Sequence, residues 1–88
     1  MDSLSFTIYL FKEKDMYVAH VLELDLSSCG ETLEQVRANI QDAVRGFVEA
    51  AEQKGTLGET LEEAGYEICG AEWKAPEYLG LQRVTMSL

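Results

Sequence analysis

The chain has 88 residues, a formal net charge of −9 and an apolar fraction of 47%. This length fits one domain, and the apolar fraction excludes a disordered protein, which combines high charge with low hydrophobicity. The negative charge excludes direct binding to DNA, RNA or a bare membrane surface, because these need clustered Lys and Arg. A domain this small buries only about 60–65% of its unfolded surface, so we expect a partner or an oligomer to stabilise it.

The first predicted element is a β-hairpin. Side chains alternate between two faces over residues 4–11, and a second alternating run covers residues 16–24. The charged residues 12–15 between them have the length of a hairpin turn. A short third strand is predicted over residues 26–29, and it ends at Gly30, which we expect to turn the chain with a positive φ.

A long amphipathic helix is the clearest prediction. Thr32 and Gln35 form a capping box, and apolar residues then recur every three or four positions. Lys54 suits the last helical turn, and Gly55 predicts the stop. Gly46 lies inside this helix, where it lowers the helix propensity. We interpret it as a site of close approach to a strand.

The elements after the long helix are shorter. A weaker capping box at residues 56–59 predicts a short helix through Ala64, and residues 66–73 are predicted to be irregular or a short strand. Alternating apolar residues over 82–88 predict a final strand. Residues 1–88 thus form a single α+β domain, a mostly antiparallel three- to four-stranded sheet with one long and one short helix on one face.

No combination of side chains in the sequence predicts catalysis, a metal site or a cofactor. His20 is the only histidine and lies in a predicted strand, and Cys29 and Cys69 are too few for a disulfide framework. We expect both thiols to be reduced and buried or half-buried. The sequence shows no signal-peptide or membrane-span pattern. We therefore expect a cytoplasmic, non-enzymatic protein with no catalytic residue, no metal and no cofactor.

The negative charge is concentrated in one part of the chain. Residues 49–77 carry eight acidic and two basic residues, a net −6, whereas residues 78–88 carry only Arg83. One interpretation is a solvated surface that keeps the protein soluble. The more specific one is a docking face for a basic protein, through electrostatic complementarity.

Several stretches resemble the HicB-like antitoxin family. They are Tyr-Val-Ala-His-Val-Leu-Glu-Leu at residues 17–24, the turn and helix start at residues 28–36, and Asn-Ile-Gln-Asp-Ala-Val at residues 39–44. The likeness covers roughly residues 5–55, and residues 63–76 are similar to the tail of the short, single-domain members. The resemblance implies a partial RNase H-like fold.

The departures from the family pattern bear on activity. Leu22 stands where the family usually has proline. Gln35 and Val36 stand where it has Glu and Ala, but Gln35 still closes the capping box and Val36 still faces the sheet, so the fold is not threatened. Many members append a helix-turn-helix or ribbon-helix-helix segment, which this sequence lacks, so we expect no separate DNA-binding domain. An RNase H-type nuclease needs a carboxylate in its first strand, and residues 5–11 contain none.

The resemblance also implies a partner. In two-component systems of this family, the antitoxin covers a small basic toxin of the HicA type, which cleaves messenger RNA. A protein with net charge −9 is suited to compete with RNA for such a basic face. On this hypothesis the chain is an antitoxin-type binding protein, and the predicted docking acids are Glu59, Glu62 and Glu63.

The alternative is a solitary domain of this fold without a toxin. It would work as a homo-oligomeric scaffold or as a small-ligand-binding protein, either as a homodimer or as a larger assembly. The predicted final strand would then lie at a sheet edge and pair across a twofold axis. The predicted interface residues are Val84, Met86 and Leu88.

Overall fold

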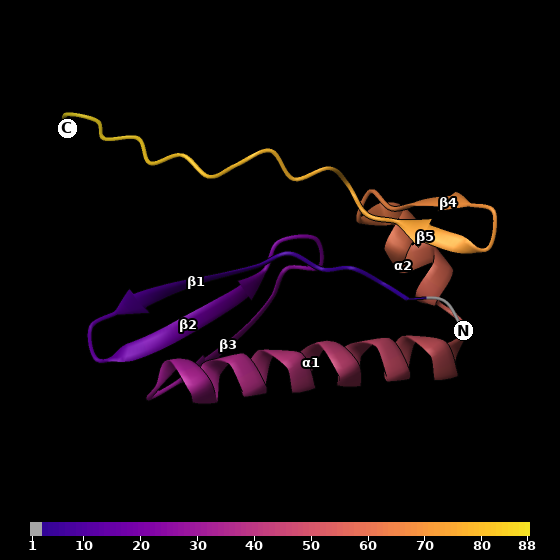
Figure 1. The fold of residues 1–88 in the computed structure, drawn as a ribbon, viewed down its shortest axis with the longest axis horizontal. Coiled ribbons are helices and arrows are strands. Elements are labelled where there is room, and N and C mark those ends of the chain that lie inside the picture. Colours follow the sequence, from indigo (N-terminus) through magenta and orange to yellow (C-terminus); the bar gives the residue numbers. More distant parts are fainter. Residues whose placement is uncertain (1–2) are drawn as a thin grey trace.

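The computed structural model describes residues 3–88, which form an α+β fold (Figure 1). The first three strands form one antiparallel sheet in the order β1–β2–β3, and the last two pair as a separate hairpin. The α+β prediction is confirmed. In chain order the elements are β1 (Ile8–Glu13), β2 (Met16–Val21), β3 (Leu26–Gly30), α1 (Leu33–Lys54), α2 (Leu57–Glu63), β4 (Glu67–Cys69) and β5 (Glu72–Lys74).

The core lies between the three-stranded sheet and α1, which runs along one face of it (Figure 1). Alternate residues of the central strand β2 point to this face, and the apolar stripe of α1 packs against them. Burying each Val or Ile side chain completely contributes about 1.5–3 kcal/mol. The buried residues of this cluster are Ala19, Val21, Val36 and Ile40.

Both predicted ends of α1 are confirmed. The Thr32 hydroxyl accepts a hydrogen bond from the backbone N–H of Gln35 at 3.0 Å, and the Gln35 side-chain oxygen accepts one from the N–H of Glu31 at 2.7 Å. At the other end Gly55 adopts φ 72°, and its N–H bonds to carbonyls of the last turn. These contacts satisfy backbone groups that the helix itself leaves unpaired.

Gly30 is required for a different reason from the one predicted. Its φ is not positive, so the expected left-handed turn at this residue is wrong. A Cβ at this buried position would instead lie 2.9 Å from the backbone nitrogen of Val36 and 3.2 Å from Cγ of Gln35. The absence of a side chain therefore lets the end of β3 touch the first turn of α1.

Gly46 has open space around it. A Cβ there would meet nothing within 4 Å, and the residue is exposed. The predicted close approach to a strand is therefore wrong, because this side of α1 faces solvent rather than the sheet.

The last part of the chain is extended but unpaired. Residues 75–88 contain no helix or strand, and no backbone hydrogen bond joins them to the rest of residues 3–88. The final strand predicted over residues 82–88 is therefore wrong for the single chain. Alternating apolar residues favour a strand, but a strand also needs a neighbouring backbone, which the single chain does not supply.

Within residues 3–88, no helix combines the length and the apolar character that crossing a membrane requires.

We predict that Gly30→Ala lowers the free energy of unfolding by about 1–3 kcal/mol, because the new methyl group forces β3 and α1 apart. A urea titration measures the change in the free energy of unfolding, with loss of helix monitored by circular dichroism at about 222 nm. A variant as stable as the original would show that the contact between β3 and α1 relaxes without cost.

We predict the opposite sign for Gly46→Ala, which is expected to raise the free energy of unfolding by about 0.5–1 kcal/mol. Alanine loses less backbone entropy than glycine in a helix, and nothing nearby opposes its methyl group. The same urea titration tests it. A loss of stability would contradict the solvent-facing placement of this part of α1.

Candidate functional site

Acidic side chains gather at one end of the molecule. The C-terminal end of α1, α2 and the β4–β5 hairpin lie together there (Figure 1). All eight acidic side chains of residues 49–77 are exposed, and none forms an ion pair with another residue of 3–88. We call this set the acidic end; its members are Glu49, Glu52, Glu59, Glu62, Glu63, Glu67, Glu72 and Glu77.

The three predicted docking acids share one side of α2. Glu59, Glu62 and Glu63 are three and four positions apart, so they are neighbours on the helix surface. All three are exposed, whereas Leu61 is fully buried on the other side of the helix. The structure thus brings these three carboxylates together at the acidic end, which makes this part of the helix a concentrated negative surface.

A Schellman motif fixes the end of α2. Gly65 has φ 95°, and its N–H bonds to the carbonyl of Glu62 at 3.0 Å, while the N–H of Tyr66 bonds to the carbonyl of Leu61 at 2.9 Å. In this motif the residue after the glycine is commonly apolar and contacts the last turn. That pattern is the sequence signal for the buried position of Tyr66, a residue predicted to lie in an irregular segment or a short strand.

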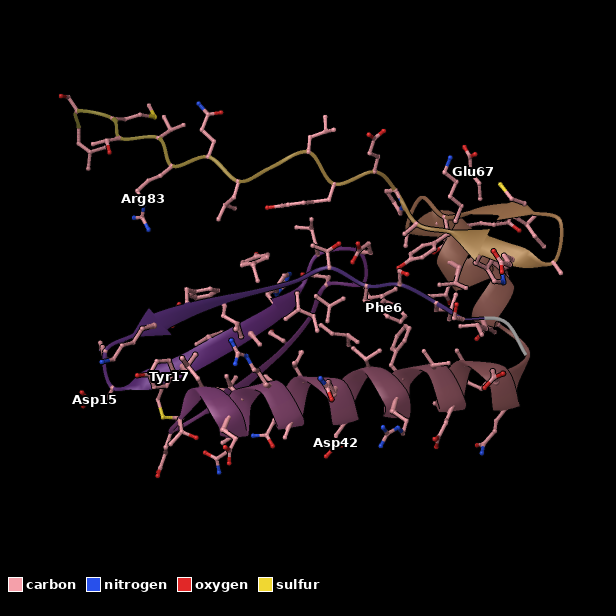
Figure 2. All side chains as sticks on the ribbon, in the orientation of Figure 1. Phe6, Asp15, Tyr17, Asp42, Glu67 and Arg83 are labelled. Carbon is pink, nitrogen blue, oxygen red and sulfur yellow. The ribbon has the colours of Figure 1, made fainter. Side chains whose placement is uncertain are left out.

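Tyr66 ties the acidic end to the start of the sheet. It is only 2% exposed, its ring centroid is 6.2 Å from that of Phe6, and its hydroxyl donates a hydrogen bond to the carbonyl of Ser5 at 2.5 Å. Phe6 extends from the N-terminal segment preceding β1 toward α1 (Figure 2). This contact spans 61 positions of sequence, so it sets where α2 and its carboxylates stand relative to the sheet.

The environment of Tyr66 shifts its ionisation. Burial raises the pKa of the Tyr66 hydroxyl to about 12, and the negative charge of the Glu23 carboxylate adds to the shift. The carboxylate of Glu23 also accepts a hydrogen bond from the N–H of Thr7 at 2.8 Å. Tyr66 therefore keeps its proton and acts as a hydrogen-bond donor throughout the physiological range.

His20 is part of a local pair. Its Nε2 lies 3.2 Å from a carboxylate oxygen of Asp25, and its ring centroid lies 5.3 Å from that of Tyr9. Asp25 is almost fully exposed in the turn after β2. Among the described residues, no group of three His, Cys, Asp or Glu side chains is arranged to hold a metal ion.

Both thiols are more accessible than predicted. Cys29 and Cys69 are free and exposed, so the expectation that they are buried or half-buried is wrong. Cys29 alternates with Ser28 and Gly30 on β3 and lies on the side away from α1. Cys69 lies at the end of β4, in a two-stranded hairpin too small to cover its own side chains.

A second surface lies where the extended C-terminal segment, residues 75–88, runs beside β1 (Figure 1). The predicted interface residues Val84, Met86 and Leu88 are all largely exposed on this segment. A cavity of about 460 Å³ separates it from β1, and its lining includes Tyr9, Phe11 and Leu81. We call this space the β1 groove.

Comparisons with known proteins add no relative. No family model matches the chain, and no match is found among curated proteins or solved structures. The resemblance to HicB-like antitoxins therefore rests on the sequence motifs alone. The two exposed features that the structure brings together are the acidic end and the β1 groove.

We predict that Tyr66→Phe lowers the free energy of unfolding by about 1–3 kcal/mol at neutral pH, because the carbonyl of Ser5 loses its donor. The raised pKa adds a pH dependence. In the native state Tyr66 keeps its proton between about pH 10 and 12, whereas the unfolded chain releases it, so its contribution is complete below pH 10 and declines as pH rises toward 12.

Urea titrations of both proteins at about pH 8 and about pH 11 measure this. The stability difference between the original protein and the phenylalanine variant should be smaller at the higher pH. An equal difference at the two pH values would contradict the assigned pKa shift, and no difference at either would contradict the hydrogen bond.

Proposed function

We propose that the protein is a non-enzymatic, cytoplasmic antitoxin-type protein that binds and masks a small basic, mRNA-cleaving toxin of the HicA type. The observation that carries this proposal is the acidic end, where eight exposed carboxylates form no ion pair with any other residue of 3–88. Carboxylates without partners in the same chain are available to Lys and Arg of another protein.

The chemistry of such a toxin fits this surface. A protein that binds RNA presents clustered Lys and Arg to the phosphates. An acidic surface occupies the same groups, excludes phosphate by repulsion, and accelerates association by long-range attraction. Glu67 illustrates the geometry, since its side chain points away from the body of the protein (Figure 2).

The rigid placement of α2 supports the proposal. Leu61 and Tyr66 are buried beneath the helix, and the hydrogen bond to Ser5 links it to the sheet. Carboxylates on a fixed helix lose less freedom on binding than carboxylates on a mobile loop. Glu59, Glu62 and Glu63 are therefore the best-placed docking acids within the acidic end.

A second candidate is a solitary homo-oligomeric scaffold or small-ligand-binding protein. An apolar cavity of about 590 Å³ between the N-terminal segment and α1 favours it, and Leu4, Phe6, Ile8, Val44 and Val48 contribute to its lining. A pocket of this size and character suits a small apolar ligand. A short basic reading frame beside the gene would favour the antitoxin, and its absence would favour the solitary protein.

We predict that replacing Glu59, Glu62 and Glu63 together by Gln weakens binding to the small basic protein encoded beside the gene by about 10- to 100-fold at low salt. The slope of log affinity against log salt should fall as well, because three charges leave the interface. Calorimetric titration at two salt concentrations measures both, and the protection of messenger RNA from cleavage gives an independent readout.

The matched control removes three exposed acids elsewhere, through Glu13→Gln, Asp15→Asn and Glu34→Gln. It removes the same number of negative charges but leaves the acidic end intact, so binding should change far less. Equal losses for the two triple variants would show that only net charge matters. Unchanged binding for the first variant would rule out α2 as the docking helix.

A further inference from the structure

The outer edge of β1 has no backbone partner. The strand order places β1 at one side of the sheet. The carbonyl of Thr7 accepts a hydrogen bond from the N–H of Leu22 at 2.9 Å, so these two residues form a hydrogen-bonded pair. Alternation along an antiparallel ladder then directs the backbone groups of Ile8, Leu10 and Lys12 away from β2. This edge is a template for another strand.

The C-terminal segment also has a backbone without hydrogen-bond partners, as the edge of β1 does. From residue 78 onward it is extended, rich in apolar side chains and free of backbone hydrogen bonds to other described residues. Val84 is 71% exposed and Met86 is 75% exposed, although both are large apolar residues. Large apolar side chains that are exposed together on one segment mark an interaction surface.

The two unpaired backbones lie along the same groove. The segment runs beside β1 and in the same direction (Figure 1). Besides the β1 groove, a cavity of about 490 Å³ lies between them closer to α2; its lining includes Leu22, Tyr78 and Leu79, with Glu23 and Glu77 at the same site. The single chain therefore has a space between two extended backbones that is apolar along residues 8–11 and acidic only at its α2 end.

We propose that this space is filled by a second copy of the chain, whose residues 82–88 add as a strand to the open edge of β1. The exchange is reciprocal, because each copy carries both the edge and the segment. A twofold axis then satisfies both edges at once. The proposal goes beyond the antitoxin function, since it concerns a surface other than the acidic end.

Charge identifies the occupant as a second copy rather than a basic protein. Residues 8–11 carry no charge, and residues 78–88 carry only Arg83, which lines the β1 groove. Figure 2 shows the Arg83 side chain on the side of the segment that faces β1. Two acidic copies thus meet through segments that carry no acidic side chain, whereas a basic partner is attracted to the acidic end.

The alternation of the segment sets the expected contacts. As a strand, residues 82–88 place Val84, Met86 and Leu88 on one face, and Arg83, Thr85 and Ser87 on the other; the strand of the second copy is therefore turned over relative to the single chain, in which Arg83 lines the groove. The apolar face packs in the groove against side chains such as Tyr9 and Phe11, whose rings lie 5.8 Å apart. The polar face remains toward water.

The test compares two double variants of the full chain, Val84→Asp with Met86→Asp and, as the control, Thr85→Asp with Ser87→Asp. Both add the same negative charge to the same exposed segment. We expect light scattering to give twice the 9.8 kDa of one chain for the original protein and for the control. The first variant should dissociate about 100-fold more readily or be monomeric.

Equal dissociation of both variants would overturn the proposal, since it would show simple charge repulsion. A monomeric original protein would overturn it too. Circular dichroism identical to that of the original protein confirms that the variants remain folded, as expected for substitutions on an exposed segment.

Amide hydrogen exchange locates the contact. The N–H groups of Ile8, Leu10 and Lys12 should be protected in the dimer and lose protection in the Val84→Asp, Met86→Asp variant. Protection in a protein of monomeric mass would show that the segment docks on its own β1, which overturns the exchange. A dimer without this protection would place the interface elsewhere, which also overturns it.

The salt dependence of dimerisation distinguishes this proposal from the antitoxin function. Dimerisation of two chains with net charge −9 should strengthen or stay constant as salt rises, because salt screens their repulsion. Binding of a basic toxin to the acidic end should weaken under the same change. A dimer that dissociates as salt rises would contradict an apolar interface, whatever happens to toxin binding.

Discussion

The packing of α1 on β2 is the constraint on which the rest of the structure depends. Only a small cluster around Ala19, Val21, Val36 and Ile40 is withdrawn from water between them. The chain has little other apolar burial, so the close contact of Gly30 with the start of α1 matters disproportionately. That contact sets how near the helix comes to the sheet, and the helix in turn carries α2 and the hairpin at its far end.

The contact of Tyr66 with Ser5 fixes the acidic end relative to the sheet and α1. Its hydroxyl reaches the N-terminal segment before β1, while its backbone closes α2. One residue thus joins the N-terminal segment before β1 to the end of α2. The carboxylates of α2 therefore have a fixed position relative to the sheet, although they themselves are fully on the surface.

Sequence reasoning predicted the elements that depend on local signals. The first hairpin, both ends of α1 and the α+β class follow from alternation, capping residues and helical periodicity. The predictions were wrong where the role of a residue depends on which distant residues pack against it. Gly30 was assigned to a turn because the approach of Val36 is not visible in sequence, and Gly46 was given a packing role that its solvent-facing position does not support.

The candidate surfaces also combine features that sequence spacing predicts with features that only the structure shows. The position of Glu59, Glu62 and Glu63 on one side of α2 follows from their spacing, whereas the anchoring role of Tyr66 needed the three-dimensional structure. Alternation in residues 82–88 was read as a strand, but the single chain offers no hydrogen-bonding partner for it. Alternation in the sequence shows that a segment favours a strand. Only the three-dimensional structure shows whether another backbone lies close enough to hydrogen-bond with it.

β3, at the opposite edge of the three-stranded sheet, is less suited than β1 to pair with another strand. β3 is short, its sequence is Leu-Ser-Ser-Cys-Gly, and the side chain of Asn39 in α1 donates a hydrogen bond at 2.9 Å to the carbonyl of Cys29. Small side chains and a carbonyl that already has a donor make β3 a poor template for a further strand. When copies pair through β1, the β3 edge of the same sheet therefore does not favour a further strand, so growth through this sheet stops at a closed pair instead of extending into a fibre.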